Sequence, residues 1–282
     1  MKINFTLRPR ALKQLALFTL STLFGVFGYC QKSATFYAQQ GLEQVKLKNY
    51  KEAIKLYDAA LSIDPGIATA YHHRGACKAR LNNYTGALLD YNRAIILGEN
   101  NYEVYYNRGV SKYWLKDYEN AIPDFDIAIK INPKIIDAFL FKGYATEALR
   151  NLKEAINNFT AAIDLDPQSA EAYGHRGNCY LMSGNYQVAL KDLDKSVAFD
   201  STLIPPRDAR AQVKYMLEDY KGALEDFNWV FSKEPNHPHT VFNRMATKLK
   251  LNDREGACED YHTGLKMGEK VNEEMEAYCK DL

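Results

Sequence analysis

YYNRGVSKYWLKDYENAIPDFDIAIKINP, residues 105–133, is the stretch that decides the fold of this chain. In its first half Tyr105 and Gly109 are four residues apart, and in its second half Ala121 and Phe125 have the same spacing. Residues at this spacing lie on one face of an α-helix. The stretch therefore predicts two helices, each with one face of apolar and small residues.

Two residues mark the ends of these helices. Asp117 lies between the halves, and an Asp or Asn at the start of a helix accepts a hydrogen bond from a backbone N–H that has no helical partner. Pro133 follows the second half, where a proline stops the helix. We therefore expect a helix–turn–helix unit that closes at Pro133.

The same unit recurs along the chain at intervals of 34 residues, and we call a set of equivalent positions a column. The first helix has an aromatic column, Tyr37, Tyr71, Tyr105, Phe139 and Tyr173, and a small column, Gly41, Gly75, Gly109, Gly143, Gly177 and Ala211. The capping column is Asn49, Asn83, Asp117, Asn151, Asn185, Asp219 and Asp253. The second helix has an alanine column, Ala53, Ala87, Ala121, Ala155, Ala189, Ala223 and Ala257, and a large apolar column, Tyr57, Tyr91, Phe125, Phe159, Leu193, Phe227 and Tyr261. Prolines close four of the units, at Pro65, Pro133, Pro167 and Pro235.

A 34-residue helix–turn–helix period with this order of aromatic, Gly, Ala, aromatic and Pro resembles the tetratricopeptide repeat family. Seven such units cover residues 34–271, with bounds 34–67, 68–101, 102–135, 136–169, 170–203, 204–237 and 238–271. The resemblance implies an all-α fold, a right-handed α-solenoid in which neighbouring helix pairs stack into one continuous core. Residues 272–282 continue the frame as a capping helix.

Residues 1–33 do not fit the repeat. The chain opens with four basic and no acidic residues, and an apolar run of about 14 residues, Leu15–Gly28, follows. We interpret residues 1–30 as a secretory signal peptide that is cleaved after Cys30, which leaves residues 31–33 at the mature N-terminus. The alternatives are a lipoprotein anchored through an acylated Cys30, and a retained anchor or ordinary helix. The expected location is the periplasm or cell envelope of a bacterium.

This cleavage changes the charge of the chain. The whole sequence has a formal net charge of +1, whereas without residues 1–30 it has 32 Lys and Arg against 35 Asp and Glu, a net charge of −3. A mildly acidic chain argues against nucleic acid as the partner.

Two columns predict ion pairs. Most tetratricopeptide repeats have an aliphatic residue just before the small column, but here that position holds Gln40, Arg74, Arg108, Lys142, Arg176, Arg210 and Arg244. Sixteen residues later stand Leu56, Asp90, Asp124, Asn158, Asp192, Asp226 and Asp260. The two columns change together, since the acid is absent where the cation is absent. We therefore predict an Arg–Asp ladder within the repeats that fixes helix packing. A cationic track for an acidic ligand, the functional alternative, requires the Asp residues to lie elsewhere.

The sixth repeat is irregular. Pro205 and Pro206 stand where its first helix should begin, and Arg207 and Val241 replace residues of the aromatic column in the last two repeats. A proline is tolerated in a first helical turn, so we expect this helix to start around Pro206. We also expect a bend, or a docking place for a partner, at this repeat.

The cysteines divide into two groups. Cys279 occupies the small column of the capping helix, and Cys258 lies beside Ala257 on the preceding helix. In an exported protein this placement predicts a disulfide between Cys258 and Cys279 that locks the cap. Cys77 and Cys179 share a column three repeats apart, and we expect them to be small buried residues.

Catalytic motifs are missing from the sequence. The histidines lack the spacing of a metal site, and there is no phosphate-binding glycine loop, no Gly-x-Ser-x-Gly and no His-Glu-x-x-His. Only 44 residues lie outside the repeats, which is too few for a catalytic domain. We therefore expect no enzyme activity, no cofactor and no metal.

The family resemblance implies that the first helices line a concave groove that binds segments of other proteins. The residues that we expect to face this groove are His72, His73, Tyr106, Asn107, Tyr113, Leu140, Tyr144, His175, Asn178, Phe242 and Asn243. We expect a non-enzymatic interaction scaffold of the cell envelope. The alternative is a binding module for an envelope glycan or peptide fragment, with Tyr106, Tyr113, Trp114 and Tyr144 as stacking surfaces.

Overall fold

The computed structural model describes residues 33–268, 270 and 272–280 of the chain, and the predicted signal peptide with Cys30 lies outside them. The described residues form fifteen α-helices and no strand, which confirms the prediction of an all-α fold built from helix pairs. None of these helices combines the length and the apolar character that crossing a membrane requires. The chain divides into two compact units, and the boundary in sequence lies between Glu99 and Asn100.

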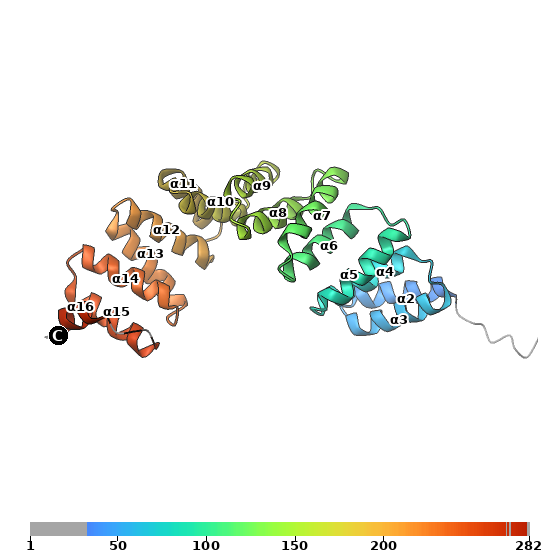
Figure 1. The fold of residues 1–282 in the computed structure, drawn as a ribbon, viewed down its shortest axis with the longest axis horizontal. Coiled ribbons are helices and arrows are strands. Elements are labelled where there is room, and N and C mark those ends of the chain that lie inside the picture. Colours follow the sequence, from blue (N-terminus) through green and yellow to red (C-terminus); the bar gives the residue numbers. More distant parts are fainter. Residues whose placement is uncertain (1–32, 269, 271, 281–282) are drawn as a thin grey trace, which may run out of the picture. The chain divides into compact units, whose positions relative to one another are not determined.

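Helix pairs are the building blocks of both units (Figure 1). The first unit contains α2 (Ala34–Lys46), α3 (Tyr50–Ile63), α4 (Ala68–Arg80) and α5 (Tyr84–Ile96). The second contains α6 (Tyr102–Trp114), α7 (Tyr118–Ile131), α8 (Ile136–Ala148), α9 (Leu152–Leu165), α10 (Ala170–Met182), α11 (Tyr186–Phe199), α12 (Ile204–Met216), α13 (Tyr220–Lys233), α14 (Pro238–Lys250), α15 (Arg254–Lys266) and α16 (Glu273–Cys279). Within each unit the second helix of one pair also packs on the first helix of the next pair, as α7 does on α8 and α11 on α12.

The turn inside each pair is built the same way seven times. Each second helix begins just after the Asn or Asp of the capping column, and the side chains of Asn83, Asn151, Asp219 and Asp253 accept a hydrogen bond from a backbone N–H of the first turn. The residue before the cap has a positive φ of 60–76° in all seven turns, at Lys48, Asn82, Lys116, Arg150, Gly184, Glu218 and Asn252. A residue in this conformation ends the first helix, so the next helix reverses direction.

Close contact between glycine and a large apolar side chain sets the helix spacing within a pair. A Cβ atom built on Gly109 would lie 2.7 Å from the ring of Phe125, and the equivalent distances at Gly41, Gly75, Gly143 and Gly177 are 2.5–2.9 Å. At these five glycines of the small column, a side chain would therefore collide with the large apolar residue of the second helix. The alanine column is completely buried beside this contact, so the two columns together form the core.

The Arg–Asp ladder joins the two helices of five of the seven pairs. In Arg74, Arg108, Arg176, Arg210 and Arg244 the Nε atom donates to the Oδ2 atom of the Asp sixteen residues later over 2.7–2.9 Å, and Nη2 donates to its Oδ1 atom. Such two-pronged pairs are the strongest arginine–carboxylate geometry. Because the Asp carboxylates pair with the arginines, the ladder does not present the cationic track that an acidic ligand would need.

The ladder extends further than the sequence predicts. The remaining prong of Arg74 donates to Asp58 over 2.6 Å and that of Arg210 to Asp194 over 3.1 Å, both on the second helix of the preceding repeat. The pairs therefore link neighbouring repeats as well as the helices within one repeat. Lys142 departs from the predicted pattern, because it pairs with Asp126 at 2.8 Å and with Glu154 rather than with the residue sixteen positions later.

The first helix of the sixth repeat starts earlier than the sequence predicts. Helix α12 begins at Ile204, two residues before the expected start, and Pro205 and Pro206 lie in its first turn. The first-turn N–H groups need no helical partner, so the prolines cost the helix nothing there. Arg207, which stands in the aromatic column, lies over the ring of Trp229 with 3.9 Å from its Cζ atom to the ring centroid.

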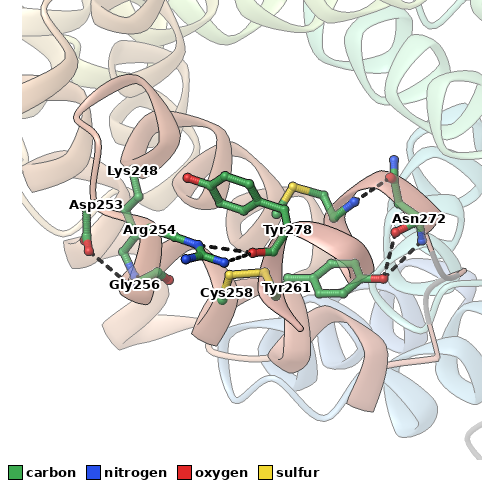
Figure 2. Close-up of a disulfide and its surroundings, with 10 residues drawn as sticks. Lys248, Asp253, Arg254, Gly256, Cys258, Tyr261, Asn272 and Tyr278 are labelled. Atoms are coloured by element: carbon green, nitrogen blue, oxygen red, sulfur yellow. Dashed lines mark hydrogen bonds between the residues drawn. A yellow bond between two sulfur atoms is a disulfide. The ribbon is translucent and has the colours of Figure 1, made fainter. Parts of the chain in front are cut away.

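The cap is held to the last repeat by a disulfide and by hydrogen bonds (Figure 2). The Cys258–Cys279 bond joins α15 to α16, with 5.5 Å between the two Cα atoms. The Arg254 side chain donates to the backbone oxygen of Tyr278, and the Tyr261 hydroxyl bonds to the backbone of Asn272. The two cysteines and Tyr261 are buried together, so α16 covers the last core surface.

Candidate functional site

A cavity of about 780 Å³ lies on the first helices α10 and α12 and on the turn that leads into α14. We call it the α10–α12 cavity. Its volume falls within the range of about 300–1,000 Å³ that is typical of ligand sites. Its lining consists of Ser169, Ala170, Glu171, Gly174, His175, Asn178, Asp200, Leu203, Ile204, Pro205, Pro206, Asp208, Ala209, Gln212, Val230, Glu234, His237 and Thr240.

The local sequence explains why α10 and α12 contact each other directly. Gly174 stands in a column that holds Tyr106 and Leu140 in earlier repeats. A Cβ atom on Gly174 would lie only 2.7 Å from Cγ of Pro206, so the bare backbone lets the first turn of α12 approach α10. The two prolines then form an apolar wall of the cavity.

The polar centre of the cavity is Asp208, two residues after this wall. Gln212 Nε2 donates to its Oδ2 atom over 2.7 Å, and the Thr240 hydroxyl lies 3.5 Å from its Oδ1 atom. Burial raises the pKa of the Asp208 carboxyl group above its ordinary value, and the hydrogen bond from Gln212 and the nearby His237 oppose this rise. The cavity thus holds a carboxylate that has lost much of its hydration.

A second carboxylate is already satisfied by neighbouring side chains. Glu147 on α8 pairs with Nδ1 of His175 at 2.9 Å and accepts a hydrogen bond from Asn178 Nδ2 at 2.7 Å. The ring of His175 also lies against Tyr144, with 4.5 Å between the centroids. Both α10 residues line the cavity, so these contacts fix the orientation of its wall.

The Asp, Glu, Lys and Arg charges of the lining have one sign, and two histidines, His175 and His237, lie among them. Among the described residues that line the cavity, Glu171, Asp200, Asp208 and Glu234 are acidic, and there is no Lys or Arg. The apolar residues Leu203, Ile204, Pro205, Pro206 and Val230 form the rest of the surface together with small residues. The cavity therefore combines apolar walls with negative charge.

A smaller hollow of about 500 Å³ occurs at the equivalent place two repeats earlier, on α6 and the start of α8. We call it the α6–α8 hollow. Its lining consists of Tyr102, Glu103, Tyr106, Asn107, Asn132, Lys134, Ile135, Ile136 and Asp137. Here Lys134 accompanies the two acidic residues, so the charges are closer to balance.

The predicted groove residues are distributed over both units. In the first unit His72 is 6% exposed and its ring lies 5.2 Å from that of His73. Burial, and then the neighbouring His73, lower the pKa of His72 to about 4. His72 therefore packs in the interior as a neutral ring and offers no exposed surface to a partner.

In the second unit most of the predicted aromatic residues contact one another. Tyr113 and Tyr144 both pack on Phe141, at 5.4 and 5.6 Å between centroids, and Tyr106 packs on the same ring at 6.0 Å. Leu140 is 8% exposed and belongs to the core. Of the four proposed stacking residues Trp114 is exposed, whereas Tyr106, Tyr113 and Tyr144 are half-buried.

The remaining predictions divide between the two hollows and the last repeat. His175 and Asn178 line the α10–α12 cavity, and Asn107 lines the α6–α8 hollow beside Tyr106. Phe242 and Asn243 are half-buried on α14 and line neither.

Sequence reasoning missed Asp208, which lies at the centre of the cavity. Its signal is visible in the sequence as a column, Ala38, His72, Tyr106, Leu140, Gly174, Asp208 and Phe242. A charged residue in a column of otherwise apolar, glycine or ring-bearing residues marks a place where the repeat framework does not dictate the side chain. Glu171 escaped notice because the groove was predicted mainly from aromatic and amide residues.

The described residues contain no group of three His, Cys, Asp or Glu side chains placed to bind a metal ion. Cys77 and Cys179 are free and buried, and burial raises their pKa values to about 11 and about 12. A thiol with so high a pKa is protonated at neutral pH and is a poor nucleophile.

Stacked helix pairs with this repeat length define an α-solenoid. Models of the tetratricopeptide repeat match residues 34–67, 102–135 and 140–203. The chain belongs to the tetratricopeptide repeat family, whose repeats generally mediate protein–protein interactions and are typically not enzymes. A comparison with curated protein sequences finds no match.

Solved structures with the same fold include three that align over most of their own length. A tetratricopeptide repeat protein from Parabacteroides merdae has a TM-score of 0.63 and 20% identity, over 88% of this chain and 97% of that one. The Pseudomonas aeruginosa protein pilF has a TM-score of 0.64 and 18% identity, over 77% and 97%. YrrB, described as a TPR protein with an unusual peptide-binding site, has a TM-score of 0.59 and 24% identity, over 65% and 94%. These similarities show the fold alone.

Proposed function

We propose that this protein is a non-enzymatic scaffold that binds a segment of a partner protein in the α10–α12 cavity. The observation that carries the proposal is the cavity itself, which lies on first helices and has a volume of about 780 Å³. Its mixture of apolar walls and a few polar groups is typical of sites that bury part of a ligand. The peptide-binding site named for YrrB supports the choice of a peptide ligand.

Two features favour this cavity over the α6–α8 hollow as the binding site. It is larger, at about 780 against 500 Å³, and its wall is held rigid by the contacts of His175 and Asn178 with Glu147. A rigid wall lowers the entropy that is lost when a partner binds. The α6–α8 hollow lacks an equivalent of the bare backbone at Gly174, because Tyr106 fills that position.

We further propose that the protein works in the bacterial cell envelope. Support comes from the basic start and apolar run of residues 1–30 and from the Cys258–Cys279 disulfide, since structural disulfides persist in oxidising compartments. Mass spectrometry of the native protein tests this idea. A mature N-terminus at Gln31 supports export, a lipid-modified Cys30 supports the anchored form, and an intact Met1 in the cytoplasm would contradict both.

Site-specific photo-crosslinking in living cells tests the binding site. A photoreactive phenylalanine replaces Gln212 in the cavity, and a matched variant carries the same group at Glu225, an exposed position on the second helix α13. We expect a discrete cross-linked protein band from position 212 and none from position 225. The cross-linked partner and the attached peptide are then identified by mass spectrometry.

The control separates the cavity from the outer surface of the repeats. A band of the same mass at both positions would show that the partner covers both faces and would contradict a groove site. A band from position 225 alone would place the interaction on the second helices.

A further inference from the structure

We infer that the α10–α12 cavity selects a cationic side chain, Lys or Arg, within an extended segment of the partner protein. This inference rests on the proposed function and adds the chemical identity of the residue that the cavity receives. It arises from the charge of the lining, which is complementary to such a side chain and to no acidic one.

The carboxylates approach the cavity from several elements. Glu171 comes from α10, Asp208 from α12 and Glu234 from the end of α13, and no Lys or Arg among the described lining residues offsets them. Complementary charge across an interface selects the partner and excludes like charges. A cation in the cavity therefore meets acidic groups contributed by three elements, whereas an acidic segment is repelled.

The apolar part of the lining suits the stem of the same side chain. Leu203, Ile204 and Pro205 line the cavity beside these carboxylates. Lys and Arg side chains bury their methylene groups against apolar surface while their charged ends remain with polar partners. The cavity offers both surfaces, which distinguishes it from an acidic patch on an open helix.

Asp208 is influenced by no Lys or Arg in the described structure, and the positive groups that act on it are the histidines His237 and His239. Its hydrogen bonds within the described structure come from a neutral amide, Gln212, and a neutral hydroxyl, Thr240. In contrast, Asp226 on the neighbouring helix pairs with Arg210 at 2.6 Å and with Lys214 at 2.7 Å. A ligand cation would supply at Asp208 the charge that two protein cations supply at Asp226.

The α6–α8 hollow has a different charge pattern from the α10–α12 cavity and therefore serves as a comparison site. Glu103 stands there in the same column as Glu171, but Lys134 also lines the hollow and Leu140 stands in the column of Asp208. We therefore expect no selection of cationic segments at this hollow. Glu103 provides a control position for substitutions in the cavity.

A random peptide library, displayed on phage and selected against the full chain, tests the inference. Enriched sequences are synthesised with their Lys or Arg and as analogues with norleucine or citrulline, which keep the carbon stem of the side chain and remove its charge. Dissociation constants are measured by fluorescence anisotropy for the wild type, the double variant Glu171→Gln/Asp208→Asn and the control Glu103→Gln. Thermal melting of each variant verifies that it is folded.

We expect the enriched peptides to share a Lys or Arg next to apolar residues. The neutral analogue and the double variant should each weaken binding about tenfold or more, because a desolvated charge loses its partner. Glu103→Gln should change the affinity by less than about twofold, as is typical of an exposed charge.

A third variant, Gln212→Trp, separates failure of the inference from failure of the proposed function. Its bulk fills the cavity whatever the ligand is. Peptides that lack a cation and are lost with Gln212→Trp would overturn the cationic selection and retain the groove. Peptides that bind Gln212→Trp like the wild type, or a library without any enrichment, would overturn both.

Discussion

The α10–α12 cavity and the α6–α8 hollow occupy equivalent places in the repeat, 68 residues apart, yet they have different shapes and charges. Tyr106 in the hollow corresponds to Gly174 in the cavity, and Leu140 corresponds to Asp208. The columns that hold the helices together, by contrast, carry glycine, alanine and large apolar residues at both places. The comparison teaches that the framework and the binding surface use different columns, so the surface can vary without loss of the fold.

The ladder also differs between the two places. At α6, Asp124 receives both Arg108 and Lys112, at 2.5 and 2.7 Å. At α10, Asp192 is held by Arg176 at 2.7 Å, and Tyr180 stands in the column of Lys112. The hollow thus has the more strongly cross-linked framework and the cavity the more specialised surface.

The largest effect is expected from removal of a ladder carboxylate. Asp124→Ala removes the buried partner of two cations and should lower the free energy of unfolding by about 3–5 kcal/mol. Asp192→Ala removes the partner of one arginine and of no lysine, and it should cost less, about 2–3 kcal/mol. Urea denaturation measures both. Equal losses would show that Lys112 contributes nothing to the difference between the two places.

Loss of the disulfide should weaken the cap and leave the α10–α12 cavity and the α6–α8 hollow unchanged. Cys258→Ser/Cys279→Ser opens a loop with a sequence separation of 21 residues, and we expect a loss of about 3 kcal/mol. Hydrogen exchange should accelerate in α15 and α16 and keep its rate in α6 and α10. Faster exchange in α10 as well would show that the cap and the cavity unfold as one unit.

Gly174→Ala tests the close approach of α10 and α12. Alanine favours a helix by about 1 kcal/mol over glycine, but its Cβ would collide with Pro206, and overpacking costs about 1–3 kcal/mol. We expect the free energy of unfolding to fall by about 1 kcal/mol and the binding of cavity ligands to weaken. A more stable variant with unchanged binding would show that the first turn of α12 moves freely.

The smallest effect on stability, and one of opposite sign, is expected from Asp208→Asn. Because burial raises the pKa of this carboxyl group in the folded state, the folded chain binds its proton more tightly than the unfolded chain, whose pKa is about 3.9. The contribution of Asp208 to stability is therefore lost as the pH rises from about 4 through the folded-state pKa. The Asn variant should melt at a higher temperature than the wild type at pH 7, and the difference should shrink at pH 4. A variant that is less stable at pH 7 would contradict this account.

The sequence predicts the framework well because each helix pair repeats the same packing problem. Once the period is known, the sequence predicts a contact between a glycine and the large apolar residue sixteen positions later, as between Gly109 and Phe125. The structure also brings together the partners that the sequence pairs in the ladder, and the two cysteines of the cap.

The binding surface is harder to predict because no packing rule governs it. Tyr144 and Leu140 were expected in the groove from their column, whereas Leu140 is buried in the core and Tyr144 packs against neighbouring rings. Asp208 was missed because its role depends on where Gly174 allows α12 to lie. That position is a property of two repeats in contact and is not visible in either one alone.

Hydrogen exchange of the full chain, with and without a peptide selected from the library, tests the central claim most directly. The account predicts that the peptide slows amide exchange in α10 and α12, within residues 170–212, and leaves α6 and α8, within residues 102–144, unchanged. Slower exchange in residues 102–144 with none in residues 170–212 would contradict it, because the partner would then bind at the hollow that the comparison assigns to the framework.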